Sequence, residues 1–149
     1  MSDMGSAPPE RQTRTIFGTH GAREVVAFDF DGTLTTHDSF TAFLKWRAGP
    51  LAWVMGMVKL VPAALAYLGH RDRGRIKADA VRAFLGGVDQ ATVAADADRY
   101  AEAVWNGFMR PDALACWNEW GAKGAHRVIV TASPEITVAP FARRLGAEN

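Results

Sequence analysis

The chain has 149 residues, enough for one domain with a buried core, and its 17 basic residues nearly balance its 16 acidic ones. This balance gives no electrostatic argument for a nucleic-acid partner. One cysteine, Cys116, excludes an intramolecular disulfide framework and fits a reducing cytosol, and no Cys and His cluster predicts a zinc site. Residues 1–23 are rich in Ser, Pro, Gly and Arg without an apolar segment, so we expect a flexible N-terminal tail.

A short apolar run from Val25 to Phe28 predicts a parallel strand that is covered on both faces. Such a strand delivers the next residues, Asp29 and Asp31, to the crevice at the carboxyl edge of an α/β sheet, and Gly32 then turns the chain. Two carboxylates held this close are unfavourable unless a cation or a shared proton relieves them, and a divalent metal is the simplest relief. The alternative is a pair of aspartates that caps a turn.

The next segments predict helices. Asp38 or Ser39 begins a helix that runs to about Arg47 and is ended by Gly49 and Pro50. Residues 51–68 then carry one charge and are apolar on all sides, so this segment must be buried in protein or lie in lipid. It is slightly shorter than the roughly 20 residues that cross a bilayer, and Pro62 would kink it.

Two features favour a membrane surface for residues 51–68. Trp53 and Tyr67 lie near its ends as interfacial anchors, and basic residues flank it on both sides. These are Lys45 and Arg47 before it, and His70, Arg71, Arg73, Arg75 and Lys77 after it. We prefer a peripheral or re-entrant hairpin to a full span, and the alternative is a helix buried within a helical cap.

Two more helices are predicted, over residues 73–85 and from Asp89 to about Asn106. The second has the clearest amphipathic pattern in the chain, and its charged positions, among them Asp96 and Asp98, are expected to be solvent-exposed. With the apolar segment these helices make an inserted helical cap over residues 38–108.

The sheet resumes after this insertion. A helix begins at Pro111, and an apolar strand then ends at Thr131 and leads into a helix start at Ser133. The Thr131 hydroxyl and free backbone N–H groups of Ala132 and Ser133 predict a phosphate-sized anion site. An ordinary strand followed by a Ser133 N-cap is the alternative, and it leaves Thr131 unexplained.

The stretch from Asp29 to Thr33 resembles the first signature of the haloacid dehalogenase superfamily of phosphatases, and the strand that ends at Thr131 resembles the second. Residues 131–135, residues 139–146 and the insertion between the signatures resemble the phosphoserine-phosphatase-like branch. The long apolar cap segment is similar to the bacterial phosphatidylglycerophosphatase type. The resemblance implies an α/β fold with a Rossmann-like parallel-sheet core, formed by residues 24–37 and 109–149, and the cap inserted between the two signatures.

The resemblance also implies roles for individual residues. Asp29 would be the nucleophile and Asp31 the general acid and base, and both would hold Mg²⁺, Asp31 through its backbone carbonyl. The phosphate contacts would come from Gly32, Thr33, Thr131 and Ala132. Asp38 is either a substrate contact or a helix cap. The family pattern also requires a later lysine and a later acidic pair, and the sequence reaches Asn149 without them. We therefore expect a fragment of a longer protein or a truncated product of doubtful activity.

Four functions compete at this point. The leading one is a Mg²⁺-dependent phosphomonoesterase acting on a lipid phosphate such as phosphatidylglycerophosphate, in the cytoplasm at the inner face of the membrane. The second is a soluble phosphatase with a small substrate such as phosphoserine. The third is an inactive pseudo-phosphatase or membrane-binding fragment. A phosphoryl-accepting receiver domain also has an aspartate at a strand end, but it lacks the paired aspartates followed by a cap.

Overall fold

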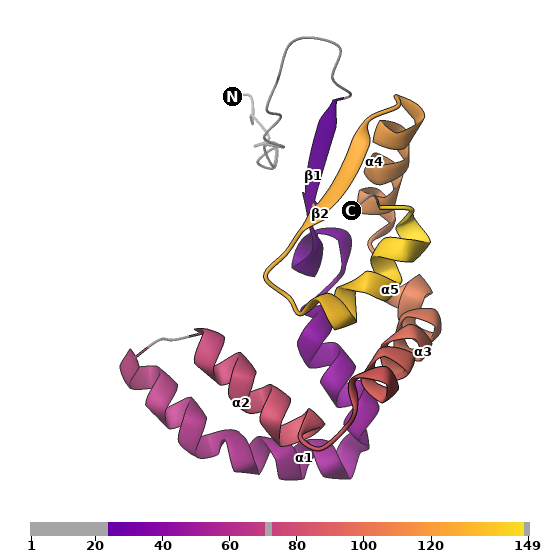
Figure 1. The fold of residues 1–149 in the computed structure, drawn as a ribbon. Helices are drawn as coiled ribbons and strands as arrows, with labels where there is room; N and C mark the ends of the chain where they lie inside the picture. The colour runs from indigo at the N-terminus through magenta and orange to yellow at the C-terminus, as the bar shows by residue number, and fades with distance from the viewer. Residues whose placement is uncertain (1–23, 71–72, 148–149) are drawn as a thin grey trace, which may run out of the picture.

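The computed structural model describes residues 24–70 and 73–147, so the predicted tail lies outside the described residues. Two strands and five helices follow each other along this part of the chain (Figure 1). They are β1 (Val25–Asp29), α1 (Ser39–His70), α2 (Arg73–Leu85), α3 (Gln90–Phe108), α4 (Pro111–Ala122), β2 (His126–Val130) and α5 (Glu135–Leu145). None of these described helices is both long enough and apolar enough to cross a membrane.

The two strands pair in parallel, with Val25 opposite His126 and Asp29 opposite Val130. Their pairing brings together segments that are about a hundred residues apart, and the helices between them and after them pack around one apolar core. The expected α/β class with a parallel sheet is confirmed. Within the described residues this sheet has two strands.

Burial of β1 differs from the expectation that both of its faces are covered. Val26 and Phe28 are buried, whereas Val25 and Ala27 on the opposite face are exposed. The covered face packs on α4, where the ring of Trp117 lies 4.9 Å from that of Phe28. The strand therefore alternates between a packed and an open face in the part of the chain that the structure describes, as strands with one covered face do.

The long segment between the two strands begins and ends at neighbouring points beside the sheet. Thr35 and Met109 form an isolated antiparallel bridge, and Arg110 N–H donates to the Leu34 carbonyl at 2.9 Å. Part of this segment shares the apolar core with α5, because the ring of Tyr100 lies 5.7 Å from Phe43 and 6.0 Å from Phe141. The division into a sheet core and a cap at residues 38 and 108 therefore stays a prediction.

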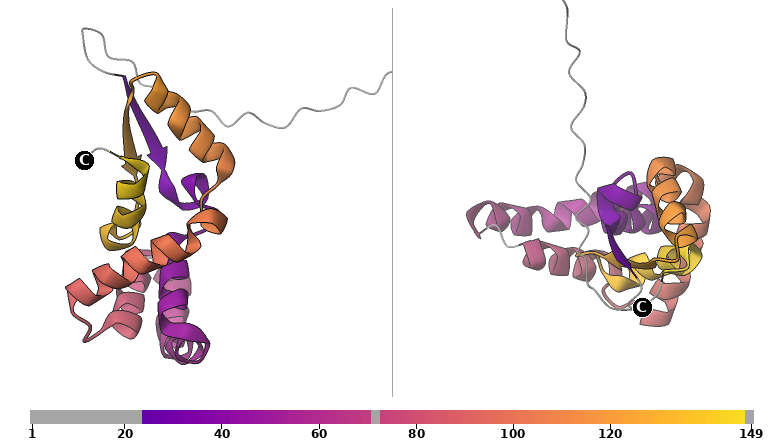
Figure 2. Two further views of the ribbon diagram at one scale, coloured as in Figure 1. Left: turned by 90° about the vertical axis from the view of Figure 1, so that its right-hand side faces the viewer. Right: turned by 90° about the horizontal axis from the view of Figure 1, so that it is seen from above.

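Helix α1 consists of two parts that meet at Gly49. This residue has φ 73° and ψ 171°, a conformation that favours glycine and that interrupts helical geometry where the sequence predicted a break. The inner part of α1 (residues 39–48) buries Phe40, Phe43 and Leu44 in the core. The outer part (residues 50–70) runs alongside α2, and the two helices project from the rest of the molecule (Figure 2).

The outer part of α1 packs on α2 through a close contact with Phe84. The ring of Trp53 stacks on that of Phe84 with centroids 5.0 Å apart. A Cβ atom at Gly56 would lie 2.2 Å from Cε1 of Phe84, so the missing side chain at Gly56 allows the two helices to approach. The ring of Trp53 is thus partly covered by α2, and its predicted role as an interfacial anchor stays a prediction.

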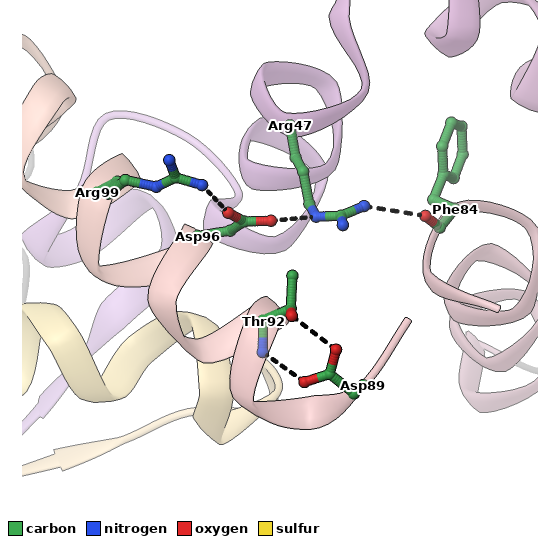
Figure 3. Close-up of polar contacts among 6 residues, drawn as sticks. All are labelled: Arg47, Phe84, Asp89, Thr92, Asp96 and Arg99. Atoms are coloured by element: carbon green, nitrogen blue, oxygen red, sulfur yellow. Dashed lines mark hydrogen bonds and ion pairs between the residues drawn. The ribbon is translucent and has the colours of Figure 1, made fainter. Parts of the chain in front are cut away.

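Arg47 joins the inner part of α1 to two other helices (Figure 3). Its Nε donates to Asp96 Oδ2 of α3 at 2.7 Å, and its Nη1 donates to the Phe84 carbonyl of α2 at 3.5 Å. Asp96 also pairs with Arg99, and its side chain is 9% exposed, so the expectation of a solvent-exposed Asp96 was wrong. The Arg99 hydrogen bond, supported by Arg47, lowers the pKa of the Asp96 carboxyl despite burial.

Candidate active site

The carboxyl ends of β1 and β2 lie side by side because the strands are parallel. Asp29 is the last residue of β1 and is exposed, and Thr131 directly follows β2 at the same edge. A hydrogen bond closes the distance between the two loops, since the Ser133 hydroxyl donates to the carboxylate of Asp31. The structure thus brings the two predicted signatures together at one edge of the sheet.

The loop from Phe30 to Leu34 is anchored by its two ends. Phe30 and Leu34 are fully buried, and Gly32 between them has φ 74°, which a residue with a side chain rarely adopts. Buried Thr35 fixes the turn from below, because its Oγ1 accepts from Gly32 N–H at 3.2 Å and donates to the His37 carbonyl at 2.8 Å. The carboxylate of Asp31 is therefore carried on a turn with buried ends and a hydrogen bond to Thr35.

Asp31 is held from two directions. Its Oδ1 accepts from the backbone N–H of Ser39 at 2.7 Å, and its Oδ2 accepts from the Ser133 hydroxyl. One donor begins α1 and the other precedes α5, so two distant segments orient one carboxylate. Asp29 is held more lightly, with Oδ2 accepting from the Thr33 hydroxyl at 2.9 Å, and its side chain stays exposed.

Ser133 is a candidate residue whose contact the sequence did not reveal. The alternative interpretation of this stretch made Ser133 the N-cap of α5, but Pro134 takes that position and no side chain caps the helix there. The available signal was its place two residues beyond Thr131, at the edge where Asp31 was expected. In this position the Ser133 hydroxyl acts as a hydrogen-bond donor to a carboxylate, whereas as a helix cap it would accept a hydrogen bond from a backbone N–H.

Some of the groups that were predicted to bind an anion are hydrogen-bonded to each other in the structure. Ser133 N–H donates to the Thr131 hydroxyl oxygen at 3.0 Å, so the expectation of a free N–H at Ser133 was wrong. The carbonyl of Ala132 accepts from Lys77 Nζ of α2 at 3.1 Å. A phosphate at this edge would meet the Thr131 hydroxyl beside that lysine.

Asp38 lies at the start of α1, where its Oδ1 accepts from Thr41 N–H at 2.7 Å in the manner of a helix cap. With His37 it also lines a groove of about 910 Å³ between α1 and α3, whose walls include Trp46, Tyr100 and Phe108. Burial, followed by the charges of Asp31 and Asp38, raises the pKa of Tyr100 to about 12. The groove does not include Asp29 or Asp31 among its lining residues, so it is separate from the paired carboxylates.

The carboxylates fit part of a magnesium site. The exposed carboxylate of Asp29 and the backbone carbonyl of Asp31 are oxygen donors, whereas both carboxylate oxygens of Asp31 already accept hydrogen bonds. Mg²⁺ retains several waters in protein sites, so two protein oxygens are compatible with its binding. No group of three His, Cys, Asp or Glu side chains lies together within the described ranges.

The haloacid dehalogenase-like hydrolase family matches residues 26–149, which include both loops of this edge. The chain belongs to this family. It is also 59% identical over 124 residues to Protein CicA from two strains of Caulobacter vibrioides, NA1000 / CB15N and ATCC 19089 / CIP 103742 / CB 15. Each match covers 83% of this chain and 55% of the relative, so the chain spans about half the length of these curated relatives. No solved structure matches the chain.

The family match includes Asp29 and Asp31 at one end and Thr131 at the other. The roles of these residues, and those of Gly32, Thr33, Ala132 and Asp38, remain predictions that the following proposal uses.

Proposed function

We propose that the protein hydrolyses phosphomonoesters through an aspartyl-phosphate on Asp29. The observation that carries this proposal is the contrast between the two carboxylates. Asp29 is exposed at the end of β1, whereas Asp31, two residues later, is fixed by Ser39 N–H and the Ser133 hydroxyl. One carboxylate is free to approach phosphorus and the other is positioned to move a proton, which is the division of work that the two-step reaction needs.

The chemistry follows from this arrangement. An oxygen of Asp29 forms a bond to phosphorus as the bond to the leaving oxygen breaks, and protonated Asp31 gives its proton to that oxygen. Asp31 then removes a proton from water, whose oxygen attacks the aspartyl-phosphate, releases phosphate and restores Asp29. Bound Mg²⁺, held by the Asp29 carboxylate and the Asp31 carbonyl, would neutralise charge on the phosphoryl group.

The loops supply the phosphoryl contacts in this proposal. The hydroxyls of Thr33 and Thr131 lie one in each loop, and they are bonded to Asp29 and to Ser133 N–H in the structure. Both hydroxyls can turn toward phosphoryl oxygens, with the backbone of Gly32 and Ala132 beside them. Asp38 would contact the leaving group from the start of α1.

We propose a lipid phosphate, such as phosphatidylglycerophosphate, as the substrate at the inner face of the cytoplasmic membrane. Support comes from an exposed apolar stripe on the outer part of α1, opposite the face that packs on α2. The stripe consists of Leu51, Val54, Met55, Met57, Val58, Val61 and Leu65, which are 44% to 76% exposed. Burying a large apolar side chain stabilises by about 1.5 to 3 kcal/mol, so several of them would favour a lipid surface. The similarity of the cap to the phosphatidylglycerophosphatase type agrees with this substrate.

The nucleophile is tested by Asp29→Asn in the intact protein with an aryl phosphate and Mg²⁺. We expect turnover to fall by at least about a thousandfold, and beryllofluoride to lose its binding as an acyl-phosphate mimic. Asp98→Asn makes the same chemical change at an exposed position on α3 and is expected to keep activity. Hydrolysis by Asp29→Asn at the wild-type rate would contradict the assignment.

The lipid surface is tested by vesicle flotation with phosphatidylglycerol-containing vesicles. We expect wild type to float at low and at high salt, because salt screens charges but not apolar burial. The double variant Val54→Asp, Val58→Asp should lose flotation, whereas Ala91→Asp, Ala95→Asp adds the same charge to exposed positions of α3 and should keep it. A wild-type protein that stays unbound at low salt would leave a soluble phosphate such as phosphoserine as the better substrate.

A further inference from the structure

Helix α2 places one basic side chain against the loop that follows β2. Lys77 Nζ donates to the Ala132 carbonyl at 3.1 Å, although the two residues are 55 positions apart in the chain. Figure 1 shows α2 lying below the loop that joins β2 to α5. This contact carries a positive charge from the segment between the strands to the sheet edge where the paired aspartates lie.

The residues around Ala132 are those of the candidate site. Thr131 precedes it, and Ser133 follows it and donates to Asp31. The ammonium group of Lys77 is thus bonded to the residue between the predicted phosphate hydroxyl and the hydroxyl that fixes a carboxylate.

Within the part of the chain that the structure describes, the charge of Lys77 differs from that of another cation near the edge in having no carboxylate partner. Arg110 reaches the Gly32 carbonyl with Nη1 at 3.4 Å, but its guanidinium is already paired with Asp112, with Nη2 2.6 Å from Oδ2. Among the described residues Lys77 has no carboxylate partner. An ammonium group has three donors, so two remain after the bond to Ala132.

An incoming phosphate would need such a cation. It brings up to two negative charges to an edge that already carries Asp29 and Asp31, and like charges at close range oppose its binding. Lysine is a compact positive charge on a flexible stem, so Nζ can move from a neutral carbonyl to a nearby phosphate oxygen without moving its helix. A charged phosphate oxygen attracts the ammonium group more strongly than the neutral carbonyl of Ala132 does.

We infer that Lys77 is a phosphate-binding residue that α2 contributes to the sheet edge. When a phosphomonoester or free phosphate occupies the edge, Nζ exchanges the Ala132 carbonyl for a phosphoryl oxygen. This inference rests on the proposed function for its substrate class, but it concerns binding and is tested without turnover. It also gives the insertion a direct part in substrate recognition.

The test compares Lys77→Gln with wild type in the intact protein, with inorganic phosphate as the probe and Mg²⁺ present. Phosphate affinity is measured by calorimetry, and thermal unfolding is measured without phosphate. We expect the dissociation constant for phosphate to rise about tenfold in Lys77→Gln, since one charged hydrogen bond is lost. Lys77→Arg should restore most of the affinity, and Lys59→Gln, an exposed lysine on the outer part of α1, should leave it unchanged.

The outcomes distinguish phosphate binding by Lys77 from a purely structural contact between α2 and the loop after β2. Equal phosphate affinity in Lys77→Gln and wild type would overturn the inference, as would wild type that binds no phosphate. A lower melting temperature with unchanged phosphate affinity would also overturn it, because Lys77 would then only hold α2 to the loop. Wild type that binds phosphate through Lys77 but hydrolyses no aryl phosphate would sustain the inference and contradict the proposed hydrolase.

Discussion

Both parts of α1 are rich in apolar residues, but they differ in what covers those residues. The inner part, residues 39–48, buries Phe40, Phe43 and Leu44 against α3 and α5. The outer part, residues 50–70, rests one face on α2 and leaves a stripe of large apolar side chains exposed, with Leu51 at 76%. Apolar content alone therefore does not distinguish a helix that builds the core from one that offers a surface.

The largest expected effect is in the inner part, at Phe43. Its side chain is fully buried and meets Tyr100 with ring centroids 5.7 Å apart. Phe43→Ala should lower the free energy of unfolding by about 3 to 5 kcal/mol, because it leaves a cavity in the core. Urea denaturation measures the change.

Leu51→Ala is the matched substitution in the outer part. Because Leu51 is exposed, we expect a change of less than about 0.5 kcal/mol in the same denaturation experiment. Comparable losses for Phe43→Ala and Leu51→Ala would break the comparison between the two parts, since the exposed stripe would then contribute to the folded core.

An intermediate effect is expected at the junction that Arg47 makes with Asp96. Asp96→Asn should cost about 2 kcal/mol at pH 7, because a nearly buried, doubly paired carboxylate is lost. The folded-state pKa of Asp96 is lowered, so its contribution is present above the ordinary value of 3.8 and is lost as pH falls through the folded pKa. Unfolding curves of wild type and Asp96→Asn should therefore converge in acid.

The control for this junction is Asp98→Asn. Asp98 is exposed and pairs with Arg143 on the surface, and such pairs contribute at most about 1 kcal/mol. A pH-independent difference between Asp96→Asn and wild type would show that the charge of Asp96 is not what stabilises the junction.

An effect comparable to that of Asp96→Asn is expected at the break between the two parts of α1. The added Cβ of Gly49→Ala meets no atom within 4 Å, so its cost is backbone strain alone, about 1 to 3 kcal/mol at φ 73° and ψ 171°. Gly107→Ala also meets no atom, but it lies in α3 with ordinary helical geometry and should be neutral or slightly stabilising. Thermal unfolding of both variants measures the difference, and a stabilised Gly49→Ala would show that the break is not required.

Local sequence signals predicted the positions of most elements. The helix expected over residues 73–85 has those bounds, the break at Gly49 was expected from Gly49-Pro50, and the two strands end within one residue of the expected positions. These features depend on residues that are close in the chain, such as an apolar run or a turn glycine. Their prediction needs no knowledge of what packs on them.

The features that the sequence did not predict depend on contacts between distant segments. Burial of Asp96 needs Arg47, 49 positions away, and the Ser133 contact needs Asp31, 102 positions away. The direction of Trp53 depends on Phe84 of α2. A charged residue in an amphipathic helix is usually interpreted as solvent-exposed, and a serine before a proline as a helix cap. Only the packed fold shows that Asp96 and Ser133 have other roles.

Because Thr35 and Met109 pair with each other, the outer part of the long insertion between the strands can in principle be replaced by a different segment. Its two ends are fastened to each other at the base, and Ser39, whose N–H holds Asp31, begins α1 just beyond Thr35. The outer part of α1 makes neither of these contacts. The entropy lost in closing a loop grows slowly with its length, at about 0.6 kcal/mol for each doubling. Insertions of other lengths and other surfaces could therefore be carried on the same paired ends, and substrate range could change while the reacting carboxylates stay where they are.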